Sequence, residues 1–485
     1  MQFSHWVIFG ISSISSTVAG CIIAANLSQS LSTPTPNPPS SATPSPTAKP
    51  SIRDIFQPGE VRPLPGQLDR VPLINSNSPE WIKQSGILLS TFPPEKKATP
   101  AAHLNYPING EFNLFAHHFT HDPKDRQTLY IGVLVHNPGT KPVAIAIPAA
   151  ASYRLEPDAP FQSKPPLLDN PNGQVFSGPG IRAVDTVLRG QRTREFPAQI
   201  VVKPGHYQLL MNGDVITKGL TKPVNGRSTL IRLKSNAPIY VATLAMFAPK
   251  NSNSKERAPT LQEWQNLLTQ GKFATPRDKI PTPPDGKGSL IYGRVAGVQV
   301  GSTWRARLTD PGQTKLTIPN VGQSISYGLS TLRSGRLGTG QIQSAKLLVR
   351  YPDTAYESHG NYATYYDLTL PLTNSTVQPQ TIALKLSSPI KQDQLVQGRL
   401  RFRQPPQTFP FFRGTIRLRY LDEQQQQQTR YLHLWHRIGQ WVDPLVKFNL
   451  KPGETRSVQV DFYYPPDATP PQVLSITTEQ ISSLN

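Results

Sequence analysis

Cysteine is the rarest residue of this 485-residue sequence, and acidic residues are few beside the basic ones. Its one cysteine is Cys21, so the chain has no intrachain disulfide framework and no thiol nucleophile further along. Asp and Glu number 30 against 50 Lys and Arg, which gives a formal net charge of +20. Charged residues still make up only 16% of the chain, unlike the highly charged composition of disordered proteins. The protein must therefore be stabilised by an ordinary buried core, and its charge favours anionic partners.

Recognisable catalytic motifs are missing as well. The glycine-rich residues 335–340 lack the Gly-Lys-Ser/Thr ending of a P-loop. Residues 388–391 match S-x-x-K in letters, but the proline within them disrupts the helix that this motif requires. No pair of carboxylates stands out for glycoside hydrolysis, although residues far apart in sequence can meet in a fold. The sequence therefore indicates no particular reaction.

Proline, by contrast, is abundant at 51 residues, about twice its average share. Because proline lacks an amide hydrogen and clashes with the preceding helical turn, long helices are disfavoured. Short apolar segments separated by Pro, Gly and Asn turns favour β-strands instead. We therefore predict a mostly β fold of two tandem antiparallel β-sandwich-like domains, with a short helix between them.

Recurring turns support the two domains. In the first half, apolar segments flank Asn137 as in a β-hairpin, and a Lys-Pro-Gly turn begins at Lys203. In the second half, apolar segments flank Asn374 in the same way, and a Lys-Pro-Gly turn begins at Lys451. The separation from asparagine to lysine is 66 residues in the first half and 77 in the second. Either the two halves repeat one architecture, or common β-turns recur by chance.

A helix interrupts the strand pattern near the middle of the chain. Thr260 and Glu263 form a capping box, which predicts a helix over residues 261–273. Its leucines and its tryptophan recur at helical spacing on one face, and several prolines follow directly. We place the domain boundary after this helix, which gives domains at residues 61–280 and 281–485.

An apolar segment over residues 6–27 opens the chain. The order Val-Ala-Gly before Cys21 resembles the bacterial lipobox, in which the cysteine is lipidated and becomes the mature N-terminus. Alternatively, cleavage after Ala24 or Ala25 would leave a mature protein without cysteine. A third alternative is an uncleaved anchor, since ~20 residues span a bilayer. Residues 1–27 are therefore a signal peptide or a membrane anchor, and each alternative exports the rest.

A stalk rich in Pro, Ser and Thr is predicted at residues 28–60. Residues 28–52 contain seven Pro, seven Ser and four Thr. This composition cannot bury a core, and it favours an extended, disordered chain. The stalk either holds the rest of the protein away from a membrane or is a tail without a spacing role.

Arginines alternate with apolar residues in two segments near the C-terminus. If the two segments pair as strands, five side chains form one cationic sheet face: Arg399, Arg401, Arg403, Arg417 and Arg419. Guanidinium groups bind phosphate, sulfate and carboxylate through paired hydrogen bonds. For an exported protein the expected partners are an anionic envelope polymer or lipid headgroups, whereas nucleic acid conflicts with export. The alternative is a solvated charged face without a ligand.

Histidines cluster at His117, His118 and His121. Imidazole is a ligand for Zn²⁺ or Cu²⁺, and a metal here is the one cofactor that the sequence suggests. In an extended strand His117 and His121 share one face while His118 lies on the other. One strand alone cannot bring both faces to a metal ion. The alternative is a strand edge whose histidines are solvated.

Five short segments are distinctive when taken together: residues 64–69, 75–80, 86–91, 115–118 and 464–474. They resemble a family of exported cyanobacterial proteins known only as a domain of unknown function. The resemblance extends from residue 61 to about residue 478. It implies an exported location and a shared fold, and it supplies no activity and no catalytic residues.

The sequence thus favours an exported cell-envelope protein without enzymatic activity, which binds an anionic envelope component. The N-terminal segment would connect it with a membrane. The alternative is a metal-dependent or carbohydrate-active hydrolase of the envelope, with His117, His118 and His121 as metal ligands.

Overall fold

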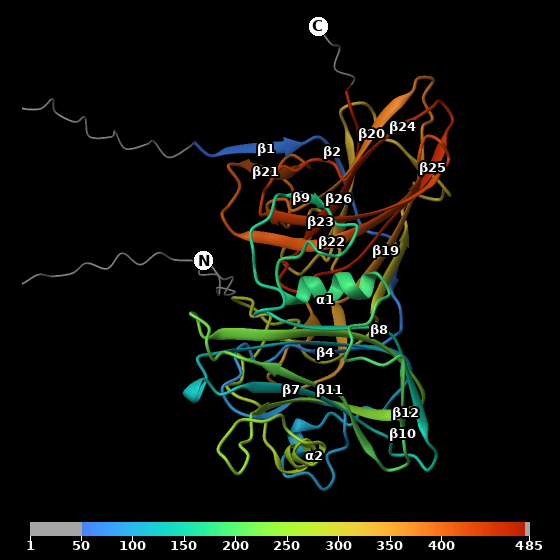
Figure 1. The fold of residues 1–485 in the computed structure, drawn as a ribbon. Helices are drawn as coiled ribbons and strands as arrows, with labels where there is room; N and C mark the ends of the chain where they lie inside the picture. Colours follow the sequence, from blue (N-terminus) through green and yellow to red (C-terminus); the bar gives the residue numbers. More distant parts are fainter. Residues whose placement is uncertain (1–50, 481–485) are drawn as a thin grey trace, which may run out of the picture.

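The structure is a computed structural model that describes residues 51–480. Cys21, the apolar segment and most of the predicted stalk lie outside these residues. The fold is mostly β, with 46% strand and 6% helix, which confirms the predicted fold class. Two lobes are stacked with the helix α1 between them (Figure 1). We call them the lower lobe and the upper lobe, as they lie in that view. Between residues 51 and 480 no helix is long and apolar enough to cross a membrane.

The lower lobe is built on an eleven-stranded sheet, counted over the described residues. Its strands are β4 (Leu73–Ser76), β5 (Gly86–Ser90), β6 (Ile108–His121), β7 (Leu129–His136), β8 (Val143–Arg154), β10 (Gln199–Val202), β11 (Tyr207–Val215), β12 (Val224–Phe247), β13 (Ala296–Gln299), β17 (Ala345–Arg350) and β18 (Glu357–Ser358). The long strand β12 connects two layers, because residues 224–235 pair with β6 and residues 240–247 pair with β7. Apolar side chains of both layers meet in one core.

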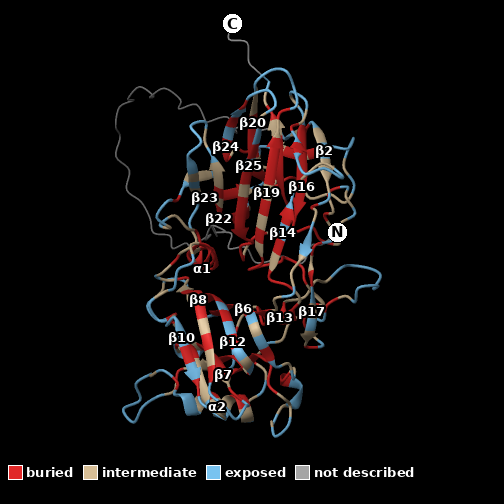
Figure 2. Ribbon diagram, turned by 90° about the vertical axis from the view of Figure 1, so that its right-hand side faces the viewer, coloured by how far each residue is buried: buried red, intermediate tan, exposed pale blue. Residues whose placement is uncertain are grey.

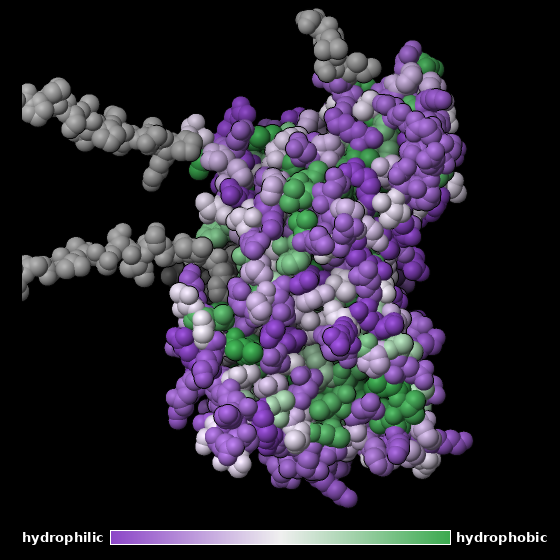
Figure 3. Space-filling view, in the orientation of Figure 1, coloured by the Kyte–Doolittle hydropathy of each residue, from purple (hydrophilic) through white to green (hydrophobic). Residues whose placement is uncertain are grey.

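The upper lobe is a sandwich of two sheets, eight-stranded and five-stranded when counted over residues 51–480. The first contains β3 (Gln67–Leu68), β9 (Leu167–Asp169), β14 (Thr303–Arg307), β15 (Leu316–Thr317), β19 (Tyr365–Thr373), β22 (Pro410–Leu421), β23 (Gln427–Arg437) and β25 (Thr455–Tyr463). The second contains β2 (Gly59–Arg62), β16 (Ser324–Leu329), β20 (Gln380–Ser387), β24 (Val446–Leu450) and β26 (Gln472–Thr478). Buried residues occur along the strands of this sandwich (Figure 2), and their apolar side chains form one core. The face of the molecule seen in Figure 3 is largely hydrophilic.

Each lobe contains a corner of the same construction, built on an asparagine. Asn137 Nδ2 donates to the carbonyl groups of Lys141 and Val202, at 2.7 and 2.9 Å. Asn374 Nδ2 donates in the same way to Gln378 and Leu450, at 2.8 and 2.9 Å. In both lobes the glycine of the Lys-Pro-Gly turn donates its amide to the carbonyl of that asparagine. The recurrence seen in the sequence therefore corresponds to one structural motif used twice.

The prediction of a hairpin around each of these asparagines is wrong. β7 pairs with β11 and β12, whereas β8 pairs with β10 and β12. Likewise β19 pairs with β25 and β20 pairs with β24. The physical reason is that each asparagine corner carries the chain from one layer of the sandwich to the other, so consecutive strands face each other across the core.

Two α-helices occur between residues 51 and 480. α2 (Leu261–Gln270) begins at the predicted capping box, in which the Thr260 hydroxyl accepts from the Glu263 amide. It packs Trp264 and Leu268 onto the lower lobe. α1 (Pro179–Leu188), which the sequence analysis did not predict, is buried along nearly its whole length and packs against β8, β12, β22 and β25. The 3₁₀ turns are η1 (Pro100–Ala102) and η2 (Lys124–Arg126).

Strands from both sides of residue 280 share sheets. β13 pairs with β4 in the lower lobe, and β9 pairs with β23 in the upper lobe. The domain boundary predicted near residue 280 therefore stays a prediction. In addition, β1 (Arg53–Gln57), which lies in the segment assigned to the stalk, pairs with β21 (Leu400–Gln404). The chain therefore crosses between the lobes several times, and loops from both lobes meet at their junction.

Candidate functional site

A cavity of about 170 Å³ lies at this junction. Its polar lining includes three cationic side chains and two carboxylates, namely Arg294, Lys391, Arg413, Glu80 and Asp467. Its walls include the aromatic rings of Trp81, Phe119, Phe161, Tyr292 and Tyr362. An apolar cavity of roughly 150 Å³ is enough to hold benzene. The volume therefore suits one ring-sized group, and domain junctions are common places for binding sites.

His117 and Asp467 face each other on the cavity wall. His117 lies on β6 with Nδ1 2.7 Å from the hydroxyl oxygen of Ser228, and its Nε2 lies 3.4 Å from Asp467 Oδ1. Burial by itself would raise the pKa of Asp467, but His117, Arg413 and Arg294 outweigh burial and hold that pKa below its ordinary value. The carboxylate is therefore ionised at neutral pH. Its second oxygen, Oδ2, is buried and has no hydrogen-bond partner among the described residues.

Arg413, near the start of β22, is a buried cation that forms no ion pair with any described residue. Its side chain is 8% exposed, and its Nε has no hydrogen-bond partner within residues 51–480. The guanidinium carbon lies 4.5 Å from the centre of the Phe161 ring. Burial lowers the pKa of Arg413, and Asp467 opposes that effect from a distance. Because an arginine side chain stays protonated in proteins, the cavity retains this positive charge.

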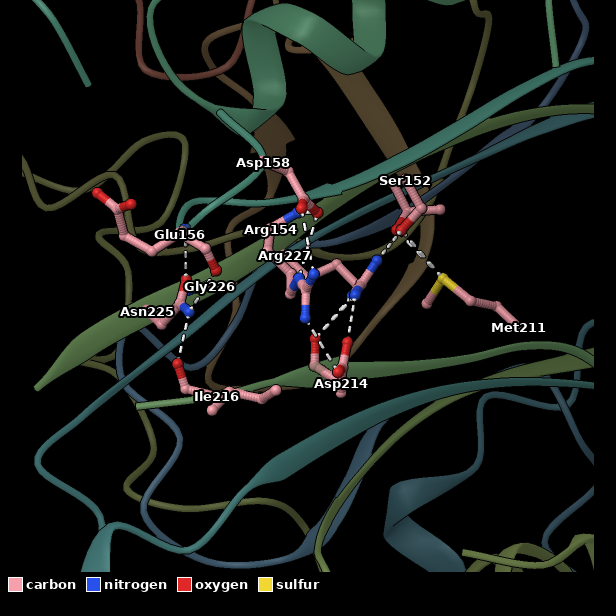
Figure 4. Close-up of polar contacts among 11 residues, drawn as sticks. Ser152, Arg154, Glu156, Asp158, Met211, Asp214, Ile216, Asn225, Gly226 and Arg227 are labelled. Atoms are coloured by element: carbon pink, nitrogen blue, oxygen red, sulfur yellow. Dashed lines mark hydrogen bonds and ion pairs between the residues drawn. The ribbon is translucent and has the colours of Figure 1, made fainter. Parts of the chain in front are cut away.

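Arg227 of the lower lobe has nearly the same burial but a full set of partners (Figure 4). Its guanidinium donates to the carboxylate and the carbonyl of Asp214, and to the Ser152 hydroxyl. The adjacent Arg154 pairs with both Asp158 and Asp214. Such a network satisfies the buried donors internally and leaves none for a ligand. The comparison distinguishes an arginine that holds strands together from one that is available inside a cavity.

The other two cations of the cavity differ from each other. Arg294 forms ion pairs with Glu80 at 2.9 Å and with Asp278 at 3.7 Å. Lys391 lies over the Tyr292 ring, with Nζ 5.9 Å from its centre, and forms no ion pair with any described residue. Burial lowers the pKa of Lys391 to about 8, so its amine is mostly protonated at neutral pH. Lys391 and Arg413 are therefore the two cations that a bound anion can neutralise.

Neutral polar groups complete the wall. His359 Nε2 donates to the carbonyl of Gly293 at 2.7 Å, and its ring lies against Tyr292 with the ring centres 4.9 Å apart. Burial lowers the pKa of His359 to about 4, so the ring is neutral at neutral pH. The Tyr362 hydroxyl donates to the carbonyl of Ala468 at 2.9 Å, next to Asp467. These contacts fix the loops that shape the cavity.

The three predicted histidine ligands lie on the two faces of β6. His117 lines the cavity, whereas His118 points away and lies 2.8 Å from the Ser76 hydroxyl. Burial lowers the pKa of His118 to about 3. His121 is exposed and lies against Trp81, with the ring centres 5.6 Å apart. Over residues 51–480 no three His, Cys, Asp or Glu side chains are grouped as a metal site requires. Metal binding through these histidines stays a prediction without a complete ligand set.

The five predicted arginines do not form one sheet face. β21, which carries Arg401 and Arg403, pairs with β1 instead of β22, and both arginines form ion pairs with Asp54. Arg417 and Arg419 of β22 both pair with the buried Asp461, at 2.6 and 3.0 Å. The expected pairing of the two segments is wrong, because β22 has β23 on one side and β25 on the other. Arg399 is exposed, just before β21.

The sequence analysis missed the cavity residues Glu80, Arg294, Lys391, Arg413 and Asp467 as a site. One signal was available. Three of the phrases that suggested a family resemblance, at residues 75–80, 115–118 and 464–474, all contribute to the cavity wall. No local pattern connects them, because they meet only where the lobes join.

Fold and cavity define a mostly β protein of two stacked lobes, with an aromatic-walled cationic cavity at their junction. The chain belongs to the DUF3370 family, described as a protein of unknown function, whose family model matches residues 59–478. No curated protein matches it in sequence. Among solved structures, the crystal structure of the coconut allergen cocosin is 8% identical over 81% of this chain and 85% of that chain, with a TM-score of 0.10. A likeness of this degree carries no argument about fold or function.

Proposed function

We propose that this protein is an exported cell-envelope binding protein whose junction cavity holds an anionic group of an envelope polymer or lipid headgroup. The observation that carries the proposal is Arg413, a buried guanidinium that has no counter-ion in contact among residues 51–480. Burying an unpaired charge costs free energy, so such a residue is retained where a bound ligand supplies the opposite charge. Lys391 supplies a second cation in the same cavity. The net charge of +20 would attract anions to the surface before they reach the cavity.

The arginines predicted from the sequence take a secondary place in this proposal. Four of them face aspartates, so an incoming anion would have to displace a carboxylate that is already in contact. Arg399 is exposed and remains as an accessory contact on the surface. The primary anion contact is therefore placed at Arg413 and Lys391.

Titration calorimetry on the whole chain with phosphate, sulfate and acetate tests the proposal. We expect at least one of these anions to bind more weakly as salt is raised, because the attraction is electrostatic. Arg413→Met, which preserves the volume of the side chain, should reduce the affinity at least tenfold, as for a lost charged hydrogen bond. Arg399→Met is the control and should have little effect. Equal binding by the wild type and Arg413→Met would refute the proposed site.

A second candidate function is a carbohydrate-active hydrolase, favoured by one observation: Glu80 and Asp467 line the same cavity. Most glycoside hydrolases use two carboxyl groups, one of which must donate a proton. Asp467 is held ionised, which suits a base or a nucleophile, and Glu80 is paired with Arg294. Release of a chromogenic group from acidic aryl glycosides, lost in Asp467→Asn, would favour this candidate over simple binding.

A further inference from the structure

After Arg413, Asp467 is the second charged residue of the cavity with an atom that lacks a hydrogen-bond partner among the described residues. Its charge limits which ligands fit the cavity. An ionised carboxylate only accepts hydrogen bonds, and Oδ2 of Asp467 has no donor among the described residues. His117 faces Oδ1 at 3.4 Å, and the Asp467 side chain is 19% exposed where it lines the cavity, so a group that fills the cavity can donate to this carboxylate. A bare anion would meet this carboxylate with like charge. A ligand that binds Arg413 must therefore also carry a hydrogen-bond donor on its Asp467 side.

The charges of the cavity decide between the available kinds of donor. Three cations line it, Arg294, Lys391 and Arg413, against the carboxylates Glu80 and Asp467. Glu80 is already paired with Arg294, so a ligand ammonium near Asp467 would also face Lys391 and Arg413 without compensation. A neutral hydroxyl donates to Asp467 without this repulsion. The donor is therefore an uncharged group such as a hydroxyl.

The walls and the volume set the size of the ligand. Trp81 and Tyr292 present rings at the cavity, and aromatic side chains commonly pack on the less polar face of a ring-shaped ligand. The cavity of about 170 Å³ holds one such ring and its substituents. A longer chain can enter only by its end.

We propose that the ligand is a single acidic sugar unit, with its acidic group on Arg413 and Lys391 and a ring hydroxyl donating to the Asp467 carboxylate. This inference rests on the proposed function and names the ligand class of the same cavity. The acidic group is a carboxylate, sulfate or phosphate. The unit comes either from the end of an acidic polysaccharide or from the headgroup of an acidic glycolipid.

Three ring-sized probes distinguish the contact made by the acidic group from the contact made by the hydroxyl group. They are glucuronate, cyclohexanecarboxylate and glucose. Calorimetry with the whole chain should give the strongest binding for glucuronate, which carries both the acid and the hydroxyls. Cyclohexanecarboxylate, which keeps the acid alone, should bind about tenfold more weakly, as expected for one lost hydrogen bond to a charged group. Glucose, which lacks the acid, should not bind measurably.

Asp467→Asn should reverse the preference. It removes a negative charge, so cyclohexanecarboxylate should bind several-fold more tightly, while glucuronate should bind about tenfold more weakly. A merely structural role of Asp467 would weaken both. Asn tolerates the positive φ of 65° at this position, so the loop should be preserved, which an unchanged melting temperature checks. Asp169→Asn, at a carboxylate whose side chain is 68% exposed, is the control and should change neither affinity.

Equal binding of glucuronate and cyclohexanecarboxylate, unaltered in Asp467→Asn, would overturn the acidic-sugar proposal while the anion site at Arg413 stands. Failure of every anion to bind, in wild type and Arg413→Met alike, would overturn the proposed function itself. The source of the sugar is tested with an acidic oligosaccharide and with phosphatidylcholine vesicles that contain a sulfated galactolipid. Competition of either with glucuronate supports the proposal and identifies the source; competition by neither contradicts it.

Discussion

Arg227 and Arg413 are buried to nearly the same extent, at 9% and 8% exposure, but only Arg227 has its donors satisfied by the protein. A buried arginine that lacks a counter-ion reduces stability, because the desolvation of its charge is not repaid by an ion pair. Under the proposed function Arg413 is retained at this cost because a ligand needs its charge. The two arginines thus differ in their contacts, a difference that burial alone does not reveal.

Replacing each arginine by methionine turns this difference into a measurement. For Arg413→Met we expect the free energy of unfolding to stay unchanged or to rise by about 1 kcal/mol, because an unpaired buried charge is removed. For Arg227→Met we expect a loss of about 1–3 kcal/mol, since the groups of Asp214 and Ser152 lose their donor. Urea denaturation of both variants checks this. A loss for Arg413→Met as large as that for Arg227→Met would contradict the distinction.

At the residue scale, the sequence allowed part of the site to be predicted. His117 stood out as a candidate, and it does line the cavity. Its partners Ser228 and Asp467 could not be predicted, because they lie on distant segments that only the tertiary fold brings together. The arginine pattern was misleading for a related reason. Alternating arginines look solvent-facing in one strand, while their neutralising aspartates, Asp54 and Asp461, lie elsewhere in the chain.

At the scale of elements, the strands could be predicted and their pairing could not. Alternating apolar residues located β7, β8, β19 and β20. Apolar segments around an asparagine are typical of a hairpin, but both Asn137 and Asn374 close a corner between layers. Each binds one nearby carbonyl and one on a strand that comes much later in the chain, β10 or β24. Local signals therefore identify the strand and leave open which layer it joins. The capping box of α2, by contrast, is local, and it was predicted correctly.

The contact between α1 and the loop before β26 offers a test at this scale. A Cβ added to Gly180 would lie 2.1 Å from Cγ of Pro466, whereas one added to Gly414 would lie 3.0 Å from Cγ of Pro465. Alanine favours a helix over glycine by about 1 kcal/mol, so a free position in α1 would be stabilised. We expect Gly180→Ala instead to destabilise the protein by about 1–3 kcal/mol, as an overpacked contact does.

Because Pro466 precedes Asp467, Gly180→Ala should also weaken binding in the cavity. Gly414→Ala serves as the milder comparison and should have a smaller effect on both quantities. Thermal unfolding and calorimetry with the best anion measure the two effects. If Gly180→Ala raised the melting temperature, the close packing of α1 on this loop would be refuted.

At the scale of the whole molecule, buried neutral histidines make stability depend on pH. Burial lowers the pKa of five histidines from 6.5 to about 3–4: His103, His118, His359, His433 and His436. The unfolded chain therefore binds more protons than the folded chain between pH 6.5 and about 4. Stability is fully present above pH 6.5 and falls as the pH drops through this window. One unit below 6.5, each histidine costs about 1.4 kcal/mol, against a total stability of roughly 5–15 kcal/mol.

We therefore expect the urea midpoint to fall steeply between pH 6.5 and 5.5, before most carboxylates take up protons. His433→Leu should reduce this slope by about one proton, since both ring nitrogens of His433 are buried without a partner in the described chain. At pH 7.5 the same variant should be as stable as the wild type or more so, because no hydrogen bond is lost. A midpoint that is constant from pH 7.5 to 5.5 would contradict the buried, neutral state of these histidines.

The proposed export determines which partners the cavity can meet, and Cys21 is the residue that tests it. If Cys21 is lipidated, labelled fatty acid should enter the protein, and the protein should fractionate with membranes. Cys21→Ser should then lose the label and be released from membranes, because without the lipid the polar stalk has no affinity for a membrane. Soluble cleavage after Ala24 or Ala25 predicts a released, unlabelled protein in both cases, and an uncleaved anchor predicts membrane association in both. Recovery of the wild-type chain in the cytoplasm would contradict all three, and with them the envelope ligand that the cavity is proposed to bind.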